Sequence, residues 1–218
     1  MKKAFTLAEV LLVIAIIGVV AAFSIPNLNS NINEDKNVII LRSSIEQLNA
    51  AYGRVLAEYG SRENASATSC GSLGTSACFA SKIVSYLDTA QNCGATKNGK
   101  CFSRTTETNL FTHTTQSAAD DDCSYMFVLA NGAGVCYVSG DSWKLDVDGP
   151  KKGSTTFGAD IFELTTFNNS FEPSNPGTTS TGRFEAFYDA TAWAFQIGNL
   201  DYLKCPNALN WINKHSCD

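Results

Sequence analysis

The fold is decided at the start of the chain, where residues 2–12 read Lys-Lys-Ala-Phe-Thr-Leu-Ala-Glu-Val-Leu-Leu. From residue 5 to residue 25 the side chains are apolar or small, and Glu9 is the one ionisable group. A helix of about 20 apolar residues crosses a hydrocarbon core of about 30 Å, so the stretch predicts a membrane-spanning helix over residues 5–26. Because the lysines precede this helix, the positive-inside bias keeps residues 1–4 in the cytoplasm and places the rest outside.

Three interpretations fit this beginning. An ordinary signal peptide would be cut after the small residues of Val20-Ala21-Ala22, and a plain anchor would not be cut at all. Neither requires Glu9, although a carboxylate within a membrane segment is costly and usually functional. A cut between Ala4 and Phe5 would create an α-amino group that is cationic at neutral pH. In a helical stack, Glu9 of one copy could neutralise that amine of its neighbour.

The third interpretation agrees with a family resemblance. Residues 2–9, followed by an apolar run that ends at Pro26, resemble the class III leader and transmembrane helix of type IV pilins and type II secretion pseudopilins. The resemblance implies that prepilin peptidase cuts between Ala4 and Phe5, that Phe5 is N-methylated, and that Glu9 sets the subunit register in a filament. Ala4 departs from the glycine that usually precedes the cut.

The same resemblance implies a domain plan and a location. Residues 1–4 form the leader, residues 5–26 the transmembrane and assembly helix, and residues 27–218 an extracytoplasmic pilin-like domain that includes the second half of the helix. The implied fold is α+β, with the long N-terminal helix packed on an antiparallel β-sheet and with loops stapled by disulfides. The protein would lie in the bacterial inner membrane before assembly and then in a pilus, at the cell surface or in the periplasm. Its partners would be prepilin peptidase, the pilus assembly platform and further copies of itself.

Length and composition limit the number of domains and the classes of function that fit the chain. A chain of 218 residues has room for one globular domain beyond the membrane segment. Its net charge of -5 gives no basic excess that would argue for nucleic acid, although binding to DNA through a local patch stays open. The chain contains no G-x-S-x-G, H-E-x-x-H or Walker-type glycine motif, so we predict that it is not an enzyme.

Eight cysteines outside the membrane segment indicate an oxidising compartment and a disulfide framework. Short loops lose little entropy on closing, which favours pairing between cysteines that are near in sequence. The expected pairs, in decreasing order of support, are Cys93 with Cys101, Cys205 with Cys217, Cys70 with Cys78, and Cys123 with Cys136. The last pair is the weakest because its ring is not centred on the turn at Asn131-Gly132, so exchange with Cys70 or Cys78 stays open.

Apolar periodicity predicts the regular structure. Residues 28–59 carry apolar side chains three and four positions apart, which predicts an amphipathic helix ending at Gly60. Residues 80–90 read as a second, short helix. Residues 124–129 and 135–139 flank Asn131-Gly132, the strongest short hairpin signal, and residues 143–147 continue as a third strand. The polar residues 103–122 and 165–182 are predicted to be exposed loops.

A second candidate site lies after the third strand. Asp146, Asp148 and Gly149 form a D-x-D-G turn, and Asp160 follows, so three carboxylates could converge where the chain bends. Oxygen ligands of this kind suit Ca²⁺, although the closing glutamate of an EF-hand is missing. The segment also resembles a loop of bacterial pilin-like proteins, some of which bind calcium in the C-terminal sheet. The alternative is a β-turn in which the aspartates accept hydrogen bonds from backbone amides. The cofactor prediction is therefore none, or Ca²⁺ at this loop.

Three functional classes remain open. The first is a structural subunit of a type IV pilus or of a related filament of secretion or competence. The second is a minor tip subunit that acts as a binding or adhesion module. The third is an exported protein that uses its N-terminus only as a membrane anchor. Copy number in purified filaments separates the three.

Overall fold

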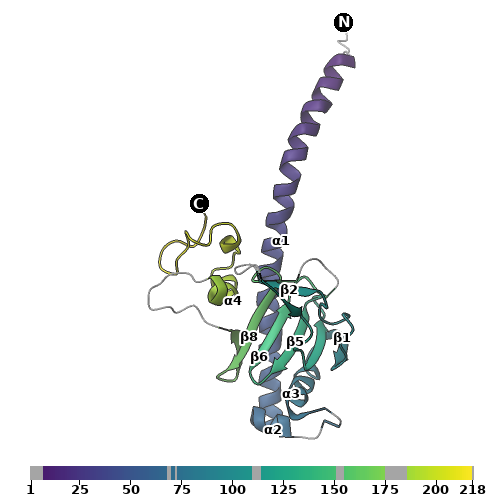
Figure 1. The fold of residues 1–218 in the computed structure, drawn as a ribbon, viewed down its shortest axis with the longest axis vertical. Helices are drawn as coiled ribbons and strands as arrows, with labels where there is room; N and C mark the ends of the chain where they lie inside the picture. The colour runs from purple at the N-terminus through teal and green to yellow at the C-terminus, as the bar shows by residue number, and fades with distance from the viewer. Residues whose placement is uncertain are drawn as a thin grey trace.

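The computed structural model is built around one long helix and one sheet (Figure 1). It describes residues 7–67, 70, 71, 73–109, 114–150, 155–174 and 186–217, and it does not describe the side chains of residues 20–32, 76, 116 and 186–188. The combination of helices with a largely antiparallel sheet agrees with the predicted α+β class.

Helix α1 (Leu7–Tyr59) continues through Pro26 as a single helix of 53 residues. A proline removes only one backbone donor, so the helix can continue on either side of it. At the other end Gly60 has a φ of 76°, in the left-handed region that glycine adopts without strain, and its amide donates to the Leu56 carbonyl at 2.8 Å. The predicted helix over residues 28–59 and its end at Gly60 are confirmed. The described chain also forms the helices α2 (Arg62–Ala67), α3 (Thr75–Val84) and α4 (Ala186–Gln196) and the 3-10 helix η1 (Asp201–Leu203).

The strands join in a single sheet. They are β1 (Thr89–Gly94), β2 (Thr106–Asn109), β3 (Thr115–Ala118), β4 (Tyr125–Leu129), β5 (Gly134–Ser139), β6 (Ser142–Asp146), β7 (Thr156–Phe157), β8 (Ile161–Phe167) and β9 (Ser170–Pro173). Their order is β1-β4-β5-β6-β8-β7-β2-β3, and β9 pairs with β8. Pairing is antiparallel except that β7 runs parallel to β2 and β8, so the sheet is mixed where a wholly antiparallel one was expected. The predicted hairpin and third strand are confirmed as β4, β5 and β6.

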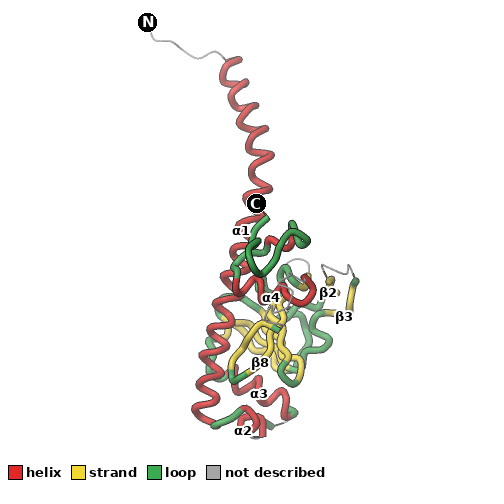
Figure 2. Tube along the Cα trace, turned by 90° about the vertical axis from the view of Figure 1, so that its left-hand side faces the viewer, coloured by secondary structure: helices red, strands yellow, loops and turns green. Residues whose placement is uncertain are grey.

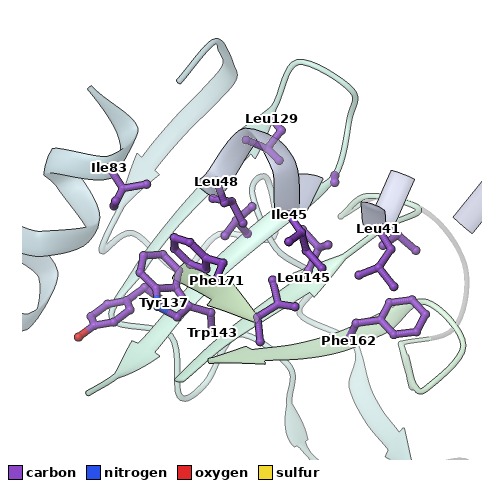
Figure 3. Packing of buried hydrophobic residues seen from close by; sticks show 14 of the residues in the cluster. Leu41, Ile45, Leu48, Ile83, Leu129, Tyr137, Trp143, Leu145, Phe162 and Phe171 are labelled. Carbon is purple, nitrogen blue, oxygen red and sulfur yellow. The ribbon is translucent and has the colours of Figure 1, made fainter. Parts of the chain in front are cut away.

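One face of the sheet packs against α1 and α3, and Figure 2 shows α1 running along this side. The helix contributes a stripe of buried residues at positions 38, 41, 45, 48, 52 and 55, the three-and-four spacing that the sequence displays. Figure 3 shows Leu41, Ile45 and Leu48 of α1 pointing at the sheet. The sheet residues that meet them are Tyr137, Trp143, Leu145, Phe162 and Phe171. This contact forms the main hydrophobic core.

The opposite face, which we call the outer face, has a smaller core. Alternate residues of β4 and β5, Met126, Val128 and Cys136, point to this side because successive strand residues face opposite ways. They pack against Phe102 and Ala119 from the described part of the segment of residues 101–123. The exposed loop predicted over residues 103–122 is wrong for part of the described segment, in which Glu107, Asn109 and Asp120 are buried. The segment contains β2 and β3, which threonine-rich sequences form readily once a neighbouring strand is available.

Two other boundaries differ from the prediction. The helix expected over residues 80–90 begins at Thr75 and ends at Val84, because the chain from Thr89 pairs with β4 and adopts strand geometry. The exposed loop expected over residues 165–182 begins later, since β8 extends to Phe167 and β9 returns beside it. Residues 175–182 of that prediction lie outside the described part of the chain.

All four expected disulfides are present: Cys70–Cys78, Cys93–Cys101, Cys123–Cys136 and Cys205–Cys217. The pair judged weakest forms because Cys136 lies opposite Met126 in the β4–β5 ladder, and the chain just before β4 brings Cys123 beside it. Exchange of these two cysteines with Cys70 or Cys78 does not occur.

Candidate functional site

The first candidate site is the beginning of α1. Every described side chain from residue 7 to residue 19 is exposed, among them Leu7, Leu12 and Ile17 with exposed fractions of 80%, 63% and 60%. The carboxylate of Glu9 lies in the first turn. An amphipathic helix carries apolar residues on one side only, whereas residues 7–19 are apolar on all sides of the helix. The described part of the domain does not cover this apolar surface.

The cleavage prediction at Ala4 and Phe5 and the methylation prediction at Phe5 fall on residues 1–6, outside the described residues. The predicted membrane segment, residues 5–26, also includes side chains that are not described. Within the parts of the chain that are described, no helix has both the length and the hydropathy of a membrane span.

The second candidate site is the aspartate turn between β6 and β8. Asp146 is the last residue of β6, and its Oδ1 accepts a hydrogen bond from the Gly149 amide at 2.9 Å. Asp160 precedes β8, and its Oδ1 accepts from the Thr156 amide at 2.5 Å. Gly149 has a φ of 89° and packs so tightly that an added Cβ would lie 2.7 Å from the Gly132 carbonyl oxygen. The aspartates therefore cap backbone amides, as the β-turn interpretation expects.

The electrostatics of this turn are unusual. Burial, together with a hydrogen bond to Asp148 and the charge of that residue, raises the pKa of Asp146 to about 8. Burial also raises the pKa of Asp160 to about 7, and the charge of Asp148 contributes. The three predicted carboxylates thus interact with one another, and burial disfavours the charged form of Asp146 and Asp160.

The ligand geometry is less compact than a finished metal site. Among the described residues, the one group of three ligand side chains whose donor atoms all lie within 4.8 Å of one another is Asp122, Cys123 and Cys136. Its cysteines are joined to each other, so they offer no thiolate. The carboxylate oxygens of Asp146, Asp148 and Asp160 do not form such a group.

A cavity of about 330 Å³ adjoins the aspartate turn. It lies between α1, β1 and the β4–β5 turn, and Asp148 and Gly149 line one side of it. Lys36 and Lys100 line it as well, which gives the cavity charges of both signs.

The sequence analysis missed a buried charge cluster on the outer face. Lys144 on β6 lies with its Nζ 3.0 Å from Glu107 Oε2 and 3.0 Å from Asp122 Oδ2, and Glu163 is its cross-strand neighbour on β8. Burial opposes the charge of Lys144, but the two carboxylates outweigh it and raise the lysine pKa. Lys144 and Glu107 are 9% and 6% exposed. No sequence pattern predicts that Lys144 and Glu107 meet, because β6 and β2 come from distant parts of the chain.

Comparison with known proteins bears on the first candidate site. No curated protein and no solved structure matches the chain. Residues 1–25 match the family model described as the prokaryotic N-terminal methylation motif. This match covers the leader, both positions of the predicted cut, and Glu9. The chain therefore carries the prepilin-type signal of type IV pilins and pseudopilins, a signal of exported, membrane-associated proteins.

Proposed function

We propose that the chain is a pilin-like structural subunit of a type IV pilus or of a related filament of type II secretion or DNA uptake. The observation that carries this proposal is the contrast within α1. After residue 38 its apolar stripe is buried on the sheet, whereas its apolar residues from 7 to 19 are exposed all round. An exposed apolar surface of this extent indicates contact with a membrane or with other subunits. The prepilin-type signal supports both contacts, first with the membrane and then, after assembly, with other subunits.

In this proposal prepilin peptidase cuts between Ala4 and Phe5, Phe5 is methylated, and α1 holds the protein in the inner membrane until it joins the filament. The Glu9 carboxylate then neutralises the amine of a neighbouring Phe5 within the apolar bundle. The globular domain reaches the cell surface or the periplasm, and no catalytic step is assigned to it.

The cut is tested by the intact mass of the protein purified from membranes. We expect a mature chain that begins at methylated Phe5. A chain that begins at Phe23 would mean ordinary signal-peptide processing and would reject the proposal.

The assembly role is tested with Glu9→Ala. We expect this variant to reach the membrane but to be lost from filaments, because a buried amine without a counter-charge is strongly destabilising. The matched control is Glu46→Ala, which removes an exposed carboxylate from the same helix outside the signal. Filaments of normal yield from Glu9→Ala would contradict the role.

Mass spectrometry of sheared surface filaments separates the proposal from its alternatives. A structural subunit dominates such a sample. A minor tip subunit that binds or adheres is present in a small amount, and an exported protein that merely uses the anchor is absent.

We also propose that the aspartate turn binds Ca²⁺ through Asp146, Asp148 and Asp160. The proposal is supported by three interacting carboxylates near one turn, two of which, Asp146 and Asp160, are buried and form no ion pair with a described lysine or arginine. If Ca²⁺ binds, the full chain in detergent should melt at a higher temperature in calcium than in chelator, since the ligand binds only the folded state. Asp148→Asn should reduce that shift. Equal melting temperatures would leave the turn with its hydrogen-bonding role alone.

A further inference from the structure

The loop closed by Cys205 and Cys217 presents an isoleucine to solvent on a fixed turn. The Asn210 side-chain oxygen accepts hydrogen bonds from the amides of Ile212 and Asn213 at 3.0 and 2.9 Å. The Asn210 amide in turn donates to the Lys214 carbonyl at 2.9 Å. Ile212 at the tip is 74% exposed. These bonds hold the backbone of the turn, and in this conformation the Ile212 side chain lies in solvent.

Contacts with α1 and with α4 place this loop. Lys204 forms a 2.7 Å ion pair with Glu34 of α1, and Arg42 of α1 donates to the Phe195 carbonyl at the end of α4 at 2.8 Å. Figures 1 and 2 both show the C-terminal loop beyond α4, extending along α1 toward the N-terminus. Glu34 is eight residues past Pro26, which corresponds to about 12 Å along a helix. The loop is thus the part of the globular domain next to the predicted membrane segment.

We propose that the loop of residues 205–217 rests on the bilayer from which α1 emerges, with Ile212 inserted among the lipid headgroups. The inference rests on the proposed function, because it requires residues 5–26 to be in the membrane. The apolar side chains that α1 exposes at residues 7–19 already call for a membrane or another subunit, so a bilayer is the occupant that this end of the molecule requires in any case. Before assembly, the contact fixes the height and tilt of the domain above the membrane.

Trp211 supports a lipid surface as the occupant. Its ring packs against Trp193 with centroids 4.9 Å apart, and its indole N–H donates to Asp189 at 3.0 Å, so the polar edge is satisfied within the protein. Trp211 is half-buried and directly precedes Ile212 in the chain. Tryptophan is enriched at membrane interfaces because its ring combines an apolar body with a polar edge. Lys214 follows in the same turn, where a long stem and a charged head suit the headgroup region.

The test uses the full chain reconstituted in phosphatidylcholine vesicles whose acyl chains carry bromine near the headgroup. Bromine quenches tryptophan fluorescence on contact. Ile212→Trp reports on the loop, and Phe167→Trp is the matched control. Phe167 is 59% exposed at the β8–β9 turn, next to Thr166, which accepts a hydrogen bond from Arg62 of α2 at the opposite end of α1. Both positions are exposed, so neither substitution disturbs the core.

We expect the added tryptophan at position 212 to be quenched at least about twofold more than the one at position 167, as an interfacial residue should be. If the chain floats with the vesicles but both positions are quenched equally, the docking is overturned while membrane anchoring stands. A blue shift at position 212 without quenching would mean that a second copy covers the loop, which also overturns the inference. A chain that does not float with vesicles rejects the membrane segment and the docking together.

Discussion

The two faces of the sheet are covered by different means. On one face, α1 and α3 bury a continuous set of large apolar side chains in the main core. On the outer face, short strands and turns between residues 101 and 123 cover a smaller apolar cluster. That cover includes the Cys123–Cys136 disulfide and the charge cluster around Lys144. The helix-covered face relies mainly on apolar burial, supplemented by the bonds of Asn49 on α1 to the Phe171 backbone, whereas the irregular cover of the outer face depends more on specific cross-links.

The outer face depends on cross-links because of the conformational entropy that its covering segment loses on folding. Ordering the backbone costs about 1 to 2 kcal/mol per residue, and a segment that buries few apolar atoms regains little of it. A disulfide lowers the cost by restricting the unfolded chain, and a buried ion pair ties two strands at fixed positions. The outer face should therefore be sensitive to the loss of single polar partners, and the helix-covered face to the loss of apolar volume.

The largest loss of stability should come from removing the Lys144 amine on the outer face. Lys144→Met removes the cation that pairs with the buried Glu107 carboxylate, and breaking such a pair costs about 3 to 5 kcal/mol. Urea unfolding followed by tryptophan fluorescence measures the loss. The double variant Lys144→Met with Glu107→Leu should recover most of it, because no buried charge remains. A single variant as stable as the wild type would show that apolar contacts alone hold this face.

On the helix-covered face the matching experiment removes volume. Leu48 is fully buried between α1 and the sheet, and Leu48→Ala should lower the free energy of unfolding by about 2 to 5 kcal/mol. The control is Ile39→Ala on the same helix, where the side chain is 66% exposed and the expected change is within about 0.5 kcal/mol. Equal losses at the two positions would contradict the assignment of the buried stripe.

The same contrast explains what the sequence could predict. The buried stripe of α1 and the β4–β5 hairpin follow from local rules: a three-and-four apolar spacing and an Asn-Gly turn. The disulfides followed from short sequence separations. These features are encoded within a few neighbouring residues, so they could be predicted before the structure was known.

The strands β2 and β3, which help to cover the outer face, could not be predicted in this way. Thr106–Asn109 becomes a strand because β3 and β7 lie on its two sides, and Thr108 donates its amide to the Thr155 carbonyl at 2.8 Å. The Lys144 cluster likewise joins residues from separate strands. For the aspartate turn, the sequence predicted the convergence of Asp146, Asp148 and Asp160, but not the depth of burial that raises two of their pKa values.

A third experiment removes the covalent link of the outer face. Replacing Cys123 and Cys136 with alanine should lower stability by about 2 to 4 kcal/mol, mainly by freeing the unfolded chain. The control pair is Cys205→Ala with Cys217→Ala, which opens the C-terminal loop instead. Hydrogen exchange distinguishes the two: the first variant should expose amides of β2 and β3, and the second should not. Unchanged exchange in β2 and β3 would mean that the disulfide does not hold the outer cover in place.

The smallest effect should be a dependence on pH. Burial raises the pKa of Glu163 above its usual value of 4.5, although Lys144 offsets part of the shift, and Glu107 and Asp122 add like charges on the same face. A carboxyl whose pKa is higher in the folded state stabilises the fold below its unfolded pKa, and this contribution is lost as pH rises through the folded value. The wild type should therefore lose stability relative to Glu163→Gln as pH increases above about 4.5. Urea unfolding of both proteins at several pH values measures the difference. Parallel curves, or a wild type that gains on the variant with rising pH, would show that the charge cluster already accommodates ionised Glu163.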